Sequence, residues 1–461
     1  MALNALDRHL ALIGFMGAGK STLVTPVGKQ LGREYFDLDQ DASRQIREMG
    51  LERFRELEAV RVMNSLEAST PRVFALGGGA VTTGEIRSTV AEFAFTVLLD
   101  VDVDEAWRRV KGSDRPLAQD EAEFRRLYAE RRPLYRDVAD AVVPSGDVDG
   151  VVLAAAGVHH ELGALDRLGE LVPGDGPVVL VSDSTVMGIY GPRAQEALGG
   201  RLVSTHELPA GEAAKQQHVV ERLWSELTID RTGTVVALGG GALTDVAGFA
   251  AATYLRGIPW VPVPTTLVGQ VDAGIGGKTA IDIPQGKNLV GAFHWPARVV
   301  IDEALLATLP EREQRQGMAE LLKTQLLAGR ELDGRGAAAY KAAICLRDPH
   351  DHGVRRWLNL GHTFAHALEA AADFDLPHGE AVALGLVAAL RLSGRDAAPV
   401  RELLDPQPVR VDPERAWRAL ARDKKRTGEE INLVLLGDDG PYVQARPADE
   451  VRAALDTLIA S

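Results

Sequence analysis

Short apolar runs alternate with amphipathic stretches along the first third of the chain. The runs lie at residues 10–15, 72–76 and 95–101, and apolar positions recur at helical spacing between them. Strands that alternate with helices are typical of an α/β fold built on a parallel sheet. The pattern fades after residues 149–162, which we expect to form the last helix of a first domain.

A second alternating pattern starts beyond residues 169–177, a segment rich in Gly and Pro that is typical of a linker. Apolar runs at 178–183, 234–238 and 260–264 predict the strands of another α/β sheet. From about residue 303 the chain is rich in Ala and Leu at helical spacing, with few strand-like runs. The sequence therefore predicts a P-loop α/β domain over 1–165, a linker over 166–176, a second α/β domain over 177–305 and a mainly helical domain over 306–461.

The hexapeptide Ala-Leu-Gly-Gly-Gly-Ala occurs twice, at residues 75–80 and 237–242. The residues that follow the two copies differ, and the first copy lies well inside its α/β unit, so we infer no internal duplication. A glycine loop after a strand lets backbone N–H groups approach a ligand closely. We expect the two loops to serve different ligands; two tight turns without a ligand are the alternative.

Charge and cysteine content narrow the class of protein. The formal net charge of −14 argues against a nucleic-acid or anionic-membrane partner, so an anionic substrate must be held by a local group of Lys and Arg. The single cysteine, Cys345, excludes an internal disulfide and is typical of the cytoplasm, where we expect the protein. We expect no signal peptide, because the first residues lack its basic and apolar regions, and no run of about 18 apolar residues predicts a membrane span.

The segment Gly14–Ser21 matches the phosphate-binding pattern G-x-x-x-x-G-K-[ST]. It follows an apolar strand and precedes helical sequence, which is the context that a P-loop requires. Its glycines expose N–H groups to phosphates, Lys20 can reach the terminal phosphate oxygens, and Ser21 can ligate Mg²⁺. Asp37 and Asp39 follow at a strand end, where they could hold a Mg²⁺-bound water and a substrate hydroxyl; a solvated strand exit is the alternative.

Four further charged residues would be ordinary surface residues if each were taken alone. They are Arg55 and Glu58, one helical turn apart, Arg115 in DRPLA and Arg131 in ERRPLY. In this order, with the P-loop, the D-x-D pair and a G-G-G after a strand, they resemble shikimate kinase over about residues 8–160, although the helical segment before Phe54 is about a turn or two shorter than the family pattern. The resemblance implies that ATP and Mg²⁺ are bound by Gly17, Gly19, Lys20, Ser21 and Thr22. It also implies that Asp39 accepts the proton of the shikimate 3-hydroxyl, that Arg115 on a lid stabilises the transferring phosphoryl group, and that the acceptor is held by Arg55, Gly78 and Arg131.

The second half carries lysines in glycine-rich sequence. Residues 262–293 include Lys278, Lys287 and Asn288 among several glycines. Nothing packs a long lysine stem in such a loop, so phosphate binding is the favoured interpretation. Glu320 and Lys323 lie one helical turn apart, so they share a face of the predicted helix. Taken alone, this pair would be interpreted as a surface salt bridge.

Three of the eleven histidines fall within residues 362–378. His362 and His366 share a helix face, and His378 follows a break at Pro377. They could place two imidazoles on one metal, or one on a metal and one beside a substrate; core histidines are the alternative. Two nitrogens, one carboxylate and an open position would suit catalytic Zn²⁺, whereas the absence of H-E-x-x-H excludes that protease class.

From about residue 175 to 440 the chain resembles 3-dehydroquinate synthase. The motifs run from P-x-G-E-x-x-K at 209–215 and G-G-G-x-x-x-D at 239–245 through P-T-T, G-G-K-T, G-K-N and A-E-x-x-K to L-N-x-G-H-T-x-x-H-A-x-E, H-G-E-A-V and D-K-K at 423–425. The resemblance implies that Zn²⁺ or Co²⁺ is bound by Glu320, His362 and His378, with His366 beside the substrate. It implies an NAD site of Asp183, Glu212, Lys215, Gly240, Gly241, Asp245, Thr265, Thr266 and Lys287. The sugar phosphate would be held by Asp272, Lys278, Asn288, Lys323, Lys341, Arg355 and Asn359, with Arg256 at its phosphate and Lys424 or Lys425 facing it.

In that family, a seven-carbon keto acid phosphate is closed into a ring. NAD⁺ transiently oxidises a hydroxyl whose oxygen the metal polarises, phosphate leaves, the hydride returns and an aldol step closes the ring. We therefore expect a bifunctional enzyme of the shikimate pathway that acts on shikimate with ATP and on 3-deoxy-arabino-heptulosonate 7-phosphate and that dimerises through its second half. The alternatives for the second half are a sister sugar phosphate cyclase or a polyol dehydrogenase. The alternatives for the first are a kinase of another small alcohol, such as gluconate, or a module that only binds ATP.

Overall fold

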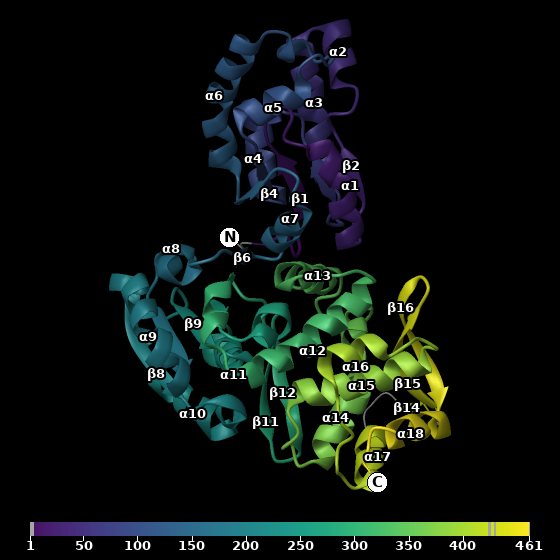
Figure 1. Ribbon diagram of the computed structural model, residues 1–461. Helices are drawn as coiled ribbons and strands as arrows, with labels where there is room; N and C mark the ends of the chain where they lie inside the picture. Colours follow the sequence, from purple (N-terminus) through teal and green to yellow (C-terminus); the bar gives the residue numbers. More distant parts are fainter. Residues whose placement is uncertain (1–3, 423–425, 428–429, 461) are drawn as a thin grey trace. The chain divides into compact units, whose positions relative to one another are not determined.

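The computed structural model describes residues 4–422, 426–427 and 430–460. The chain divides into two compact units, one ending at His159 and the other starting at His160 (Figure 1). Each unit contains its own parallel sheet, which confirms the expected α/β class.

Five parallel strands form the sheet of the first unit, in the order β2-β3-β1-β4-β5. The strands are β1 (His9–Ile13), β2 (Tyr35–Asp37), β3 (Val73–Ala75), β4 (Ala94–Asp100) and β5 (Ala141–Pro144). Every residue of β1 and β3 is buried, as expected for strands whose two faces are both covered by helices. The helices are α1 (Lys20–Leu31), α2 (Ala42–Met49), α3 (Leu51–Leu66), α4 (Gly84–Phe93), α5 (Val103–Val110), α6 (Glu121–Val138) and α7 (Val148–Ala155).

The last helix of this unit is shorter than the sequence predicted. Helix α7 ends at Ala155, and strand β6 (Val158–His160) follows, so residues 149–162 do not form one helix. Gly157 between them has a φ of 75°, the left-handed conformation in which glycine commonly ends a helix. The apolar run continues past this glycine, which is why the pattern alone suggested a longer helix.

The Gly- and Pro-rich segment after the first unit is packed, which differs from the linker expected over 166–176. Helix α8 (Leu168–Leu171) buries Leu168 and Leu171. The Arg201 guanidinium donates to backbone carbonyl oxygens along the segment, with Val172 at 2.8 Å as the nearest. The segment can pack as turns of the second unit because Arg201 provides hydrogen-bond donors for its backbone carbonyl groups.

The first part of the second unit is built on four parallel strands in the order β10-β9-β7-β8. They are β7 (Val178–Asp183), β8 (Leu202–Leu208), β9 (Thr234–Gly239) and β10 (Trp260–Pro264), and the helices between them are α9 (Ser184–Leu198), α10 (Gln217–Glu226) and α11 (Gly241–Thr253). An antiparallel hairpin follows, made of β11 (Lys278–Ile283) and β12 (Gly286–Phe293), and then β13 (Val299–Ile301).

The remainder of the second unit is mainly helical, as predicted. Its helices are α12 (Glu311–Ala328), α13 (Gly334–Arg347), α14 (His362–Ala371), α15 (His378–Leu392), α16 (Ala398–Leu404), α17 (Pro413–Arg422) and α18 (Ala448–Asp456). The pattern did not predict the antiparallel sheet of β14 (Arg426–Thr427), β15 (Glu430–Gly437) and β16 (Gly440–Pro447). β15 buries Ile431 and Leu435 in the same core as the helices. Within the described ranges, no helix combines the length and apolar character that crossing a bilayer requires.

Two glycines allow α14 and α15 to approach each other closely. A Cβ atom on Gly385 would lie 2.1 Å from the carbonyl oxygen of Gly361 and 3.2 Å from the Ala365 nitrogen. The backbone of one helix therefore contacts the other with no space for a methyl group. Because α14 begins at His362 and α15 at His378, this contact also controls how far apart these two histidines lie.

We expect Gly385→Ala to destabilise the second unit, because the added methyl group must push α14 away from α15. Overpacking of this kind costs about 1–3 kcal/mol. Gly188→Ala on α9 is the matched control, since a Cβ there meets no atom within 4 Å and alanine is the better helix former. Urea unfolding followed by circular dichroism measures the change; equal loss of stability in both variants would contradict the packing argument.

Candidate active sites

The P-loop of the first unit connects β1 to α1. Gly17 and Gly19 have φ values of 82° and 83°, which glycine adopts without strain. Lys20 is the first residue of α1 and is buried; its Nζ donates to loop carbonyl oxygens, the nearer being that of Gly14 at 2.7 Å. Burial lowers the pKa of Lys20 to about 8, against the opposing charge of Asp39. The loop thus places a cation and a helix N-terminus where phosphates can bind.

Two cavities lie next to this loop. One, of about 430 Å³, is lined by the predicted nucleotide residues Gly17, Gly19, Lys20, Ser21 and Thr22. The other, of about 390 Å³, is lined by part of α2 and by the predicted acceptor residues Arg55, Gly78 and Arg131. Both cavities are lined by Ser21, Asp39 and Arg115. A group transferred from one cavity to the other would therefore move past these three side chains.

The carboxylate of Asp39 is influenced by two nearby cations. Burial raises the pKa of Asp39, while the charges of Lys20 and Arg115 oppose that rise. The Asp39 N–H donates to Asp37 Oδ1 at 3.0 Å, which fixes the turn after β2. A carboxylate with a raised pKa is suited to accept a proton from an alcohol.

The first glycine triplet makes space for two charged side chains of α3. A Cβ on Gly77 would lie 2.1 Å from Glu58 Oε1, and one on Gly79 would overlap the Arg55 guanidinium. Arg55 forms an ion pair with the buried Glu58 carboxylate, and burial raises the pKa of Glu58 against that pairing. Gly78 instead offers its carbonyl oxygen, which accepts from Arg131 Nη1 at 3.3 Å. The triplet therefore leaves space for two side chains and offers a carbonyl oxygen to a third. These contacts within the protein are additional to any contact with a ligand.

Sequence reasoning missed three residues around these cavities. Arg109 on α5 lines the nucleotide cavity and donates to the Gly17 carbonyl at 2.9 Å and to Ser145 Oγ at 2.6 Å. Tyr135 on α6 is buried and donates to the carbonyl of Gly78. No motif marks Arg109 or Ser145, whereas Tyr135 was part of the R-x-P-L-Y pattern without being assigned a role.

The second glycine triplet, Gly239–Gly241, ends β9 and starts α11. A Cβ on Gly240 would lie 3.1 Å from Thr266 Cγ2. The Thr265 N–H donates to the Gly239 carbonyl at 3.0 Å, so the loop after β10 lies directly beside this turn. Strand, glycine turn and helix N-terminus together leave a cradle suited to the pyrophosphate of a dinucleotide.

A buried lysine connects this cradle to the β11–β12 hairpin. Lys215 ends the short 3₁₀ helix Gly211–Lys215, and its Nζ donates to Asp245 Oδ2 at 2.7 Å and to Asn288 Oδ1. Next to Asn288, Lys287 pairs with Glu212 at 3.4 Å. These predicted residues come from separate segments, and the structure brings them together.

Four predicted residues are not part of this group. Asp183 ends β7, and its carboxylate accepts from two N–H groups of the first turn of α9 at 2.9 and 3.0 Å. Asn359 is half-buried at the end of the 3₁₀ helix Val354–Asn359. Arg256 is exposed at the turn after α11, and within the described ranges no hydrogen bond or ion pair joins it to the other predicted residues. Lys424, like its neighbour Lys425, lies outside the described residues.

Lysines and acids alternate in a buried row that leads to the predicted metal ligands. Asp272 pairs with Lys341 and, at 3.4 Å, with Lys323. Lys323 in turn contacts Glu320, one turn earlier on α12, as its spacing predicted. Burial alone would raise the pKa of Glu320, but the charge of Lys323 and contact with His362 hold that pKa well below its usual value. Glu320 therefore carries a negative charge and is suited to bind a metal cation.

Two more cations lie at the start of β11 and after α13. Lys278 Nζ pairs with Asp351 Oδ2 at 2.5 Å. Arg355 is 1% exposed, and its guanidinium donates to the carbonyl oxygens of Pro349 at 2.8 Å and Gly276 at 2.7 Å. Neutral carbonyl groups hold Arg355 without cancelling its charge.

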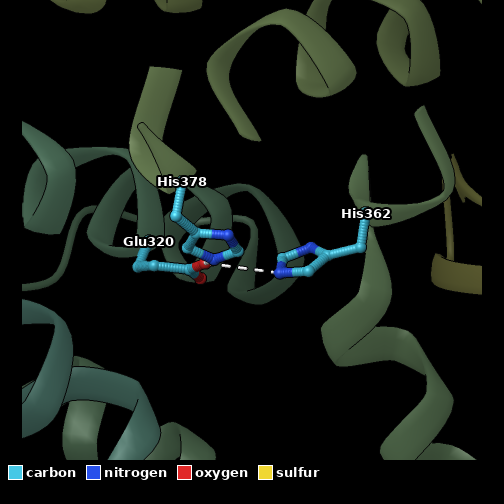
Figure 2. A group of neighbouring side chains, drawn as sticks. All are labelled: Glu320, His362 and His378. Atoms are coloured by element: carbon cyan, nitrogen blue, oxygen red, sulfur yellow. Dashed lines mark hydrogen bonds and ion pairs between the residues drawn. The ribbon is translucent and has the colours of Figure 1, made fainter. Parts of the chain in front are cut away.

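Three ligand side chains converge from three helices, as Figure 2 shows. The potential ligand atoms of Glu320, His362 and His378 lie within 4.8 Å of one another. Glu320 Oε1 is 3.3 Å from His362 Nε2 and 3.1 Å from His378 Nε2. His366 lies next to them, with its ring centre 5.4 Å from that of His362. One carboxylate and two imidazoles are the donor set that a Zn²⁺ or Co²⁺ site would need.

Glu369 is a further member of this centre that sequence reasoning did not assign. It lies on α14, and its Oε1 is 3.1 Å from Nδ1 of His378. A carboxylate on Nδ1 fixes the ring and leaves Nε2 as the metal-binding nitrogen. The glutamate was visible in the motif that contains His362 and His366, but its partner comes from the next helix.

Comparisons with known proteins agree with the division of the chain into two units. The shikimate kinase family model matches residues 16–154, and models of the N- and C-terminal domains of 3-dehydroquinate synthase match residues 205–316 and 335–426. The 3-dehydroquinate synthase of Symbiobacterium thermophilum is 40% identical over 349 residues, which cover 67% of this chain and 97% of that protein.

Two solved structures resemble the second unit. The 2-epi-5-epi-valiolone synthase ValA of Streptomyces hygroscopicus subsp. jinggangensis, with NAD⁺ and Zn²⁺ bound, is 29% identical with a TM-score of 0.56, over 65% of this chain and 95% of that one. A 2-deoxy-scyllo-inosose synthase complexed with carbaglucose-6-phosphate, NAD⁺ and Co²⁺ is 25% identical with a TM-score of 0.58, over 65% and 96%. The chain therefore belongs to the 3-dehydroquinate synthase family and carries a shikimate kinase domain ahead of the synthase domains.

Proposed function

We propose that the first unit phosphorylates shikimate with ATP and that the second converts 3-deoxy-arabino-heptulosonate 7-phosphate to 3-dehydroquinate with loss of phosphate. The observation that carries the second activity is the convergence of Glu320, His362 and His378 beside the buried row of lysines. The first activity rests on two cavities that share Asp39 and Arg115.

In the kinase unit, each residue serves positioning or charge neutralisation, which phosphoryl transfer chiefly requires. Lys20 and the loop N–H groups would hold the phosphates of ATP, and Ser21 would ligate the Mg²⁺ that accompanies it. Asp39 accepts the hydroxyl proton while Arg115 neutralises charge on the transferring group. Arg55 and Arg131 bind the shikimate carboxylate, for which a fork-shaped guanidinium is suited.

The acceptor cavity supports shikimate despite the short α2–α3 connection. Only Gly50 separates the two helices, yet α2 contributes Ser43 and Ile46 to the cavity wall and α3 contributes Arg55. The shortening therefore leaves a cavity of about 390 Å³ that Arg55 and Arg131 line. We propose shikimate as the acceptor in preference to gluconate, and ADP release with a panel of acceptors distinguishes the two. ATP binding with no ADP release on any acceptor would indicate a module that only binds ATP.

In the synthase unit, Glu320, His362 and His378 would hold the metal, and the Gly239–Gly241 turn with Thr265 and Thr266 would hold NAD. When bound, NAD supplies reversible oxidation of the substrate hydroxyl and the metal polarises the oxygen that is oxidised. Lys278, Lys341 and Arg355 bind the phosphate and carboxylate of the sugar. His366 orients substrate groups beside the metal ligands.

The choice within the cyclase group rests on sequence identity. The 3-dehydroquinate synthase relative is 40% identical, against 29% and 25% for the two sister cyclases. A polyol dehydrogenase would have little use for Lys323, which is 1% exposed in an alternating row of charges. Net formation of NADH from an alcohol would favour the dehydrogenase, whereas phosphate release without net NADH would favour the synthase.

Asp39→Asn should lower the kcat for phosphorylation by about 10²–10⁴-fold, the usual contribution of a general base, while ATP still binds. Because only ionised Asp39 accepts a proton, activity falls as pH decreases through its pKa. Burial raises that pKa, so the acidic limb lies at higher pH than for an exposed aspartate. The measurements are ADP release as a function of pH and ATP binding by calorimetry. The control is Asp137→Asn, at an exposed position of α6. An unchanged acidic limb in Asp39→Asn would contradict the assignment.

Glu369→Gln should weaken metal binding by about 10–100-fold, because outer-shell partners of metal-bound histidines typically contribute that much. Competition with a chromophoric chelator measures the metal affinity directly. The control is Glu402→Gln on α16, an exposed glutamate away from the metal ligands. Unchanged affinity in Glu369→Gln would show that His378 does not depend on this carboxylate.

Each activity should survive loss of the other, because the two sites are built from separate units. Lys20→Met should reduce phosphorylation at least about 100-fold, as loss of a charge-stabilising donor does, and leave cyclisation intact. His362→Ala should do the reverse. ADP release with shikimate and phosphate release with the heptulosonate phosphate, assayed on the same preparations, test both; loss of both activities in either variant would argue against independent sites.

A further inference from the structure

Phe374 lies outside the residues assigned above, yet it contacts one of them. Its ring centre is 4.7 Å from Nζ of Lys287. Phe374 belongs to the loop between α14 and α15, whereas Lys287 is on β12, so the contact joins the helical part of the second unit to its hairpin. The ring is 43% exposed and is therefore not a core residue.

The backbone of this loop has an uncommon conformation. Asp373 and Phe374 have φ values of 52° and 65°, and non-glycine residues rarely adopt the left-handed region, least of all bulky ones. Arg415 on α17 holds the Asp373 carboxylate, with one hydrogen bond of 2.8 Å, and the Phe374 N–H donates to the Glu369 carbonyl at 2.8 Å. Strained backbone that is fixed in this way is characteristic of functional positions. Here its effect is to bring the ring to Lys287.

An aromatic ring positions an ammonium group differently from a carboxylate. The ring attracts the charge through its face and uses none of the three N–H donors of the lysine. Lys287 also pairs with Glu212 at 3.4 Å, so the ring and the carboxylate together fix its Nζ. Donors remain available for another oxygen ligand.

The surroundings of Lys287 indicate which ligand this is. Its neighbour Asn288 accepts from Lys215, which pairs with Asp245 on α11, the helix that starts at the glycine cradle. Lys287 on β12 therefore borders a chain of contacts that runs through the Lys215 ammonium group to α11, the helix whose N-terminus forms the cradle. The chemistry that matches these donors is a phosphate group.

We propose that Phe374 is a positioning residue that holds Lys287 Nζ for a phosphate oxygen, supplied by the dinucleotide or by the sugar phosphate. The proposal rests on the function proposed for the second unit. Leucine in place of Phe374 keeps an apolar side chain but has no π face, whereas tyrosine keeps the face. The two substitutions therefore separate cation attraction from simple packing.

Two measurements on the purified full chain test this: the Kd of NAD⁺ by calorimetry and the KM of the heptulosonate phosphate. Phe374→Leu should raise one of them by about 2- to 30-fold, the range expected for a cation–π contact. Phe374→Tyr should stay within about 2-fold of the unchanged chain, as should the control Phe93→Leu, at an exposed phenylalanine of the kinase unit. A change in the Kd of NAD⁺ identifies the dinucleotide phosphate, and a change in KM alone identifies the sugar phosphate.

The Lys287→Met background shows whether the ring acts through the lysine. If it does, Phe374→Leu has no further effect there, whereas independent effects multiply. Equal weakening by leucine and tyrosine, multiplying effects, or no change in either constant would overturn the proposal. No turnover of the heptulosonate phosphate by the unchanged chain would instead contradict the proposed function, and the NAD⁺ measurement would still test the role of Phe374.

Discussion

Compensation of buried charge is the constraint on which the second unit depends. Glu320 is 0% and Lys323 1% exposed, and a lone charge at such depth would be neutralised or would destabilise the fold. The row Lys341–Asp272–Lys323–Glu320 alternates in sign, and Glu320 then meets two imidazoles. One network therefore sets the orientation of Glu320, the proposed metal ligand, and the positions of Lys323 and Lys341, the lysines proposed to bind the substrate. A change at any member alters both.

Two cations of the kinase unit are held in another way. Lys20 and Arg131 donate to the carbonyl oxygens of Gly14 and Gly78, which are neutral groups. Such acceptors fix the direction of a cation but do not cancel its charge. The Lys20 charge is thus left for incoming phosphates, and burial, which lowers its pKa to about 8, makes an anionic partner more favourable still. A chain with a net charge of −14 creates locally positive sites in this way.

The sequence predicted those features whose evidence is contained in a short segment. The P-loop, both sheets and the pairing of Glu320 with Lys323 follow from local spacing, and motif order indicated which distant residues would meet. Contacts with a partner from another element were missed where no motif marked the pair. Glu369 gains its role from His378 on the next helix, and the turns over 169–177 are packed because Arg201 binds their carbonyls. The roles assigned to the site residues stay predictions, and for Asp183 and Arg256 no described contact joins them to the other predicted residues.

The repeated hexapeptide shows what a glycine triplet after a strand does predict. None of the six glycines has a positive φ value, so a need for unusual backbone conformation does not explain why glycine occupies these positions. Five of them share close approach, whereas a Cβ on Gly78 would have no neighbour closer than 3.5 Å. In the first copy, the approaching groups are the side chains of Arg55 and Glu58, and in the second they are Leu243, Thr266 and Ala273. The same letters therefore specify an absence of Cβ atoms beside a strand end, and the surrounding fold determines what occupies the space.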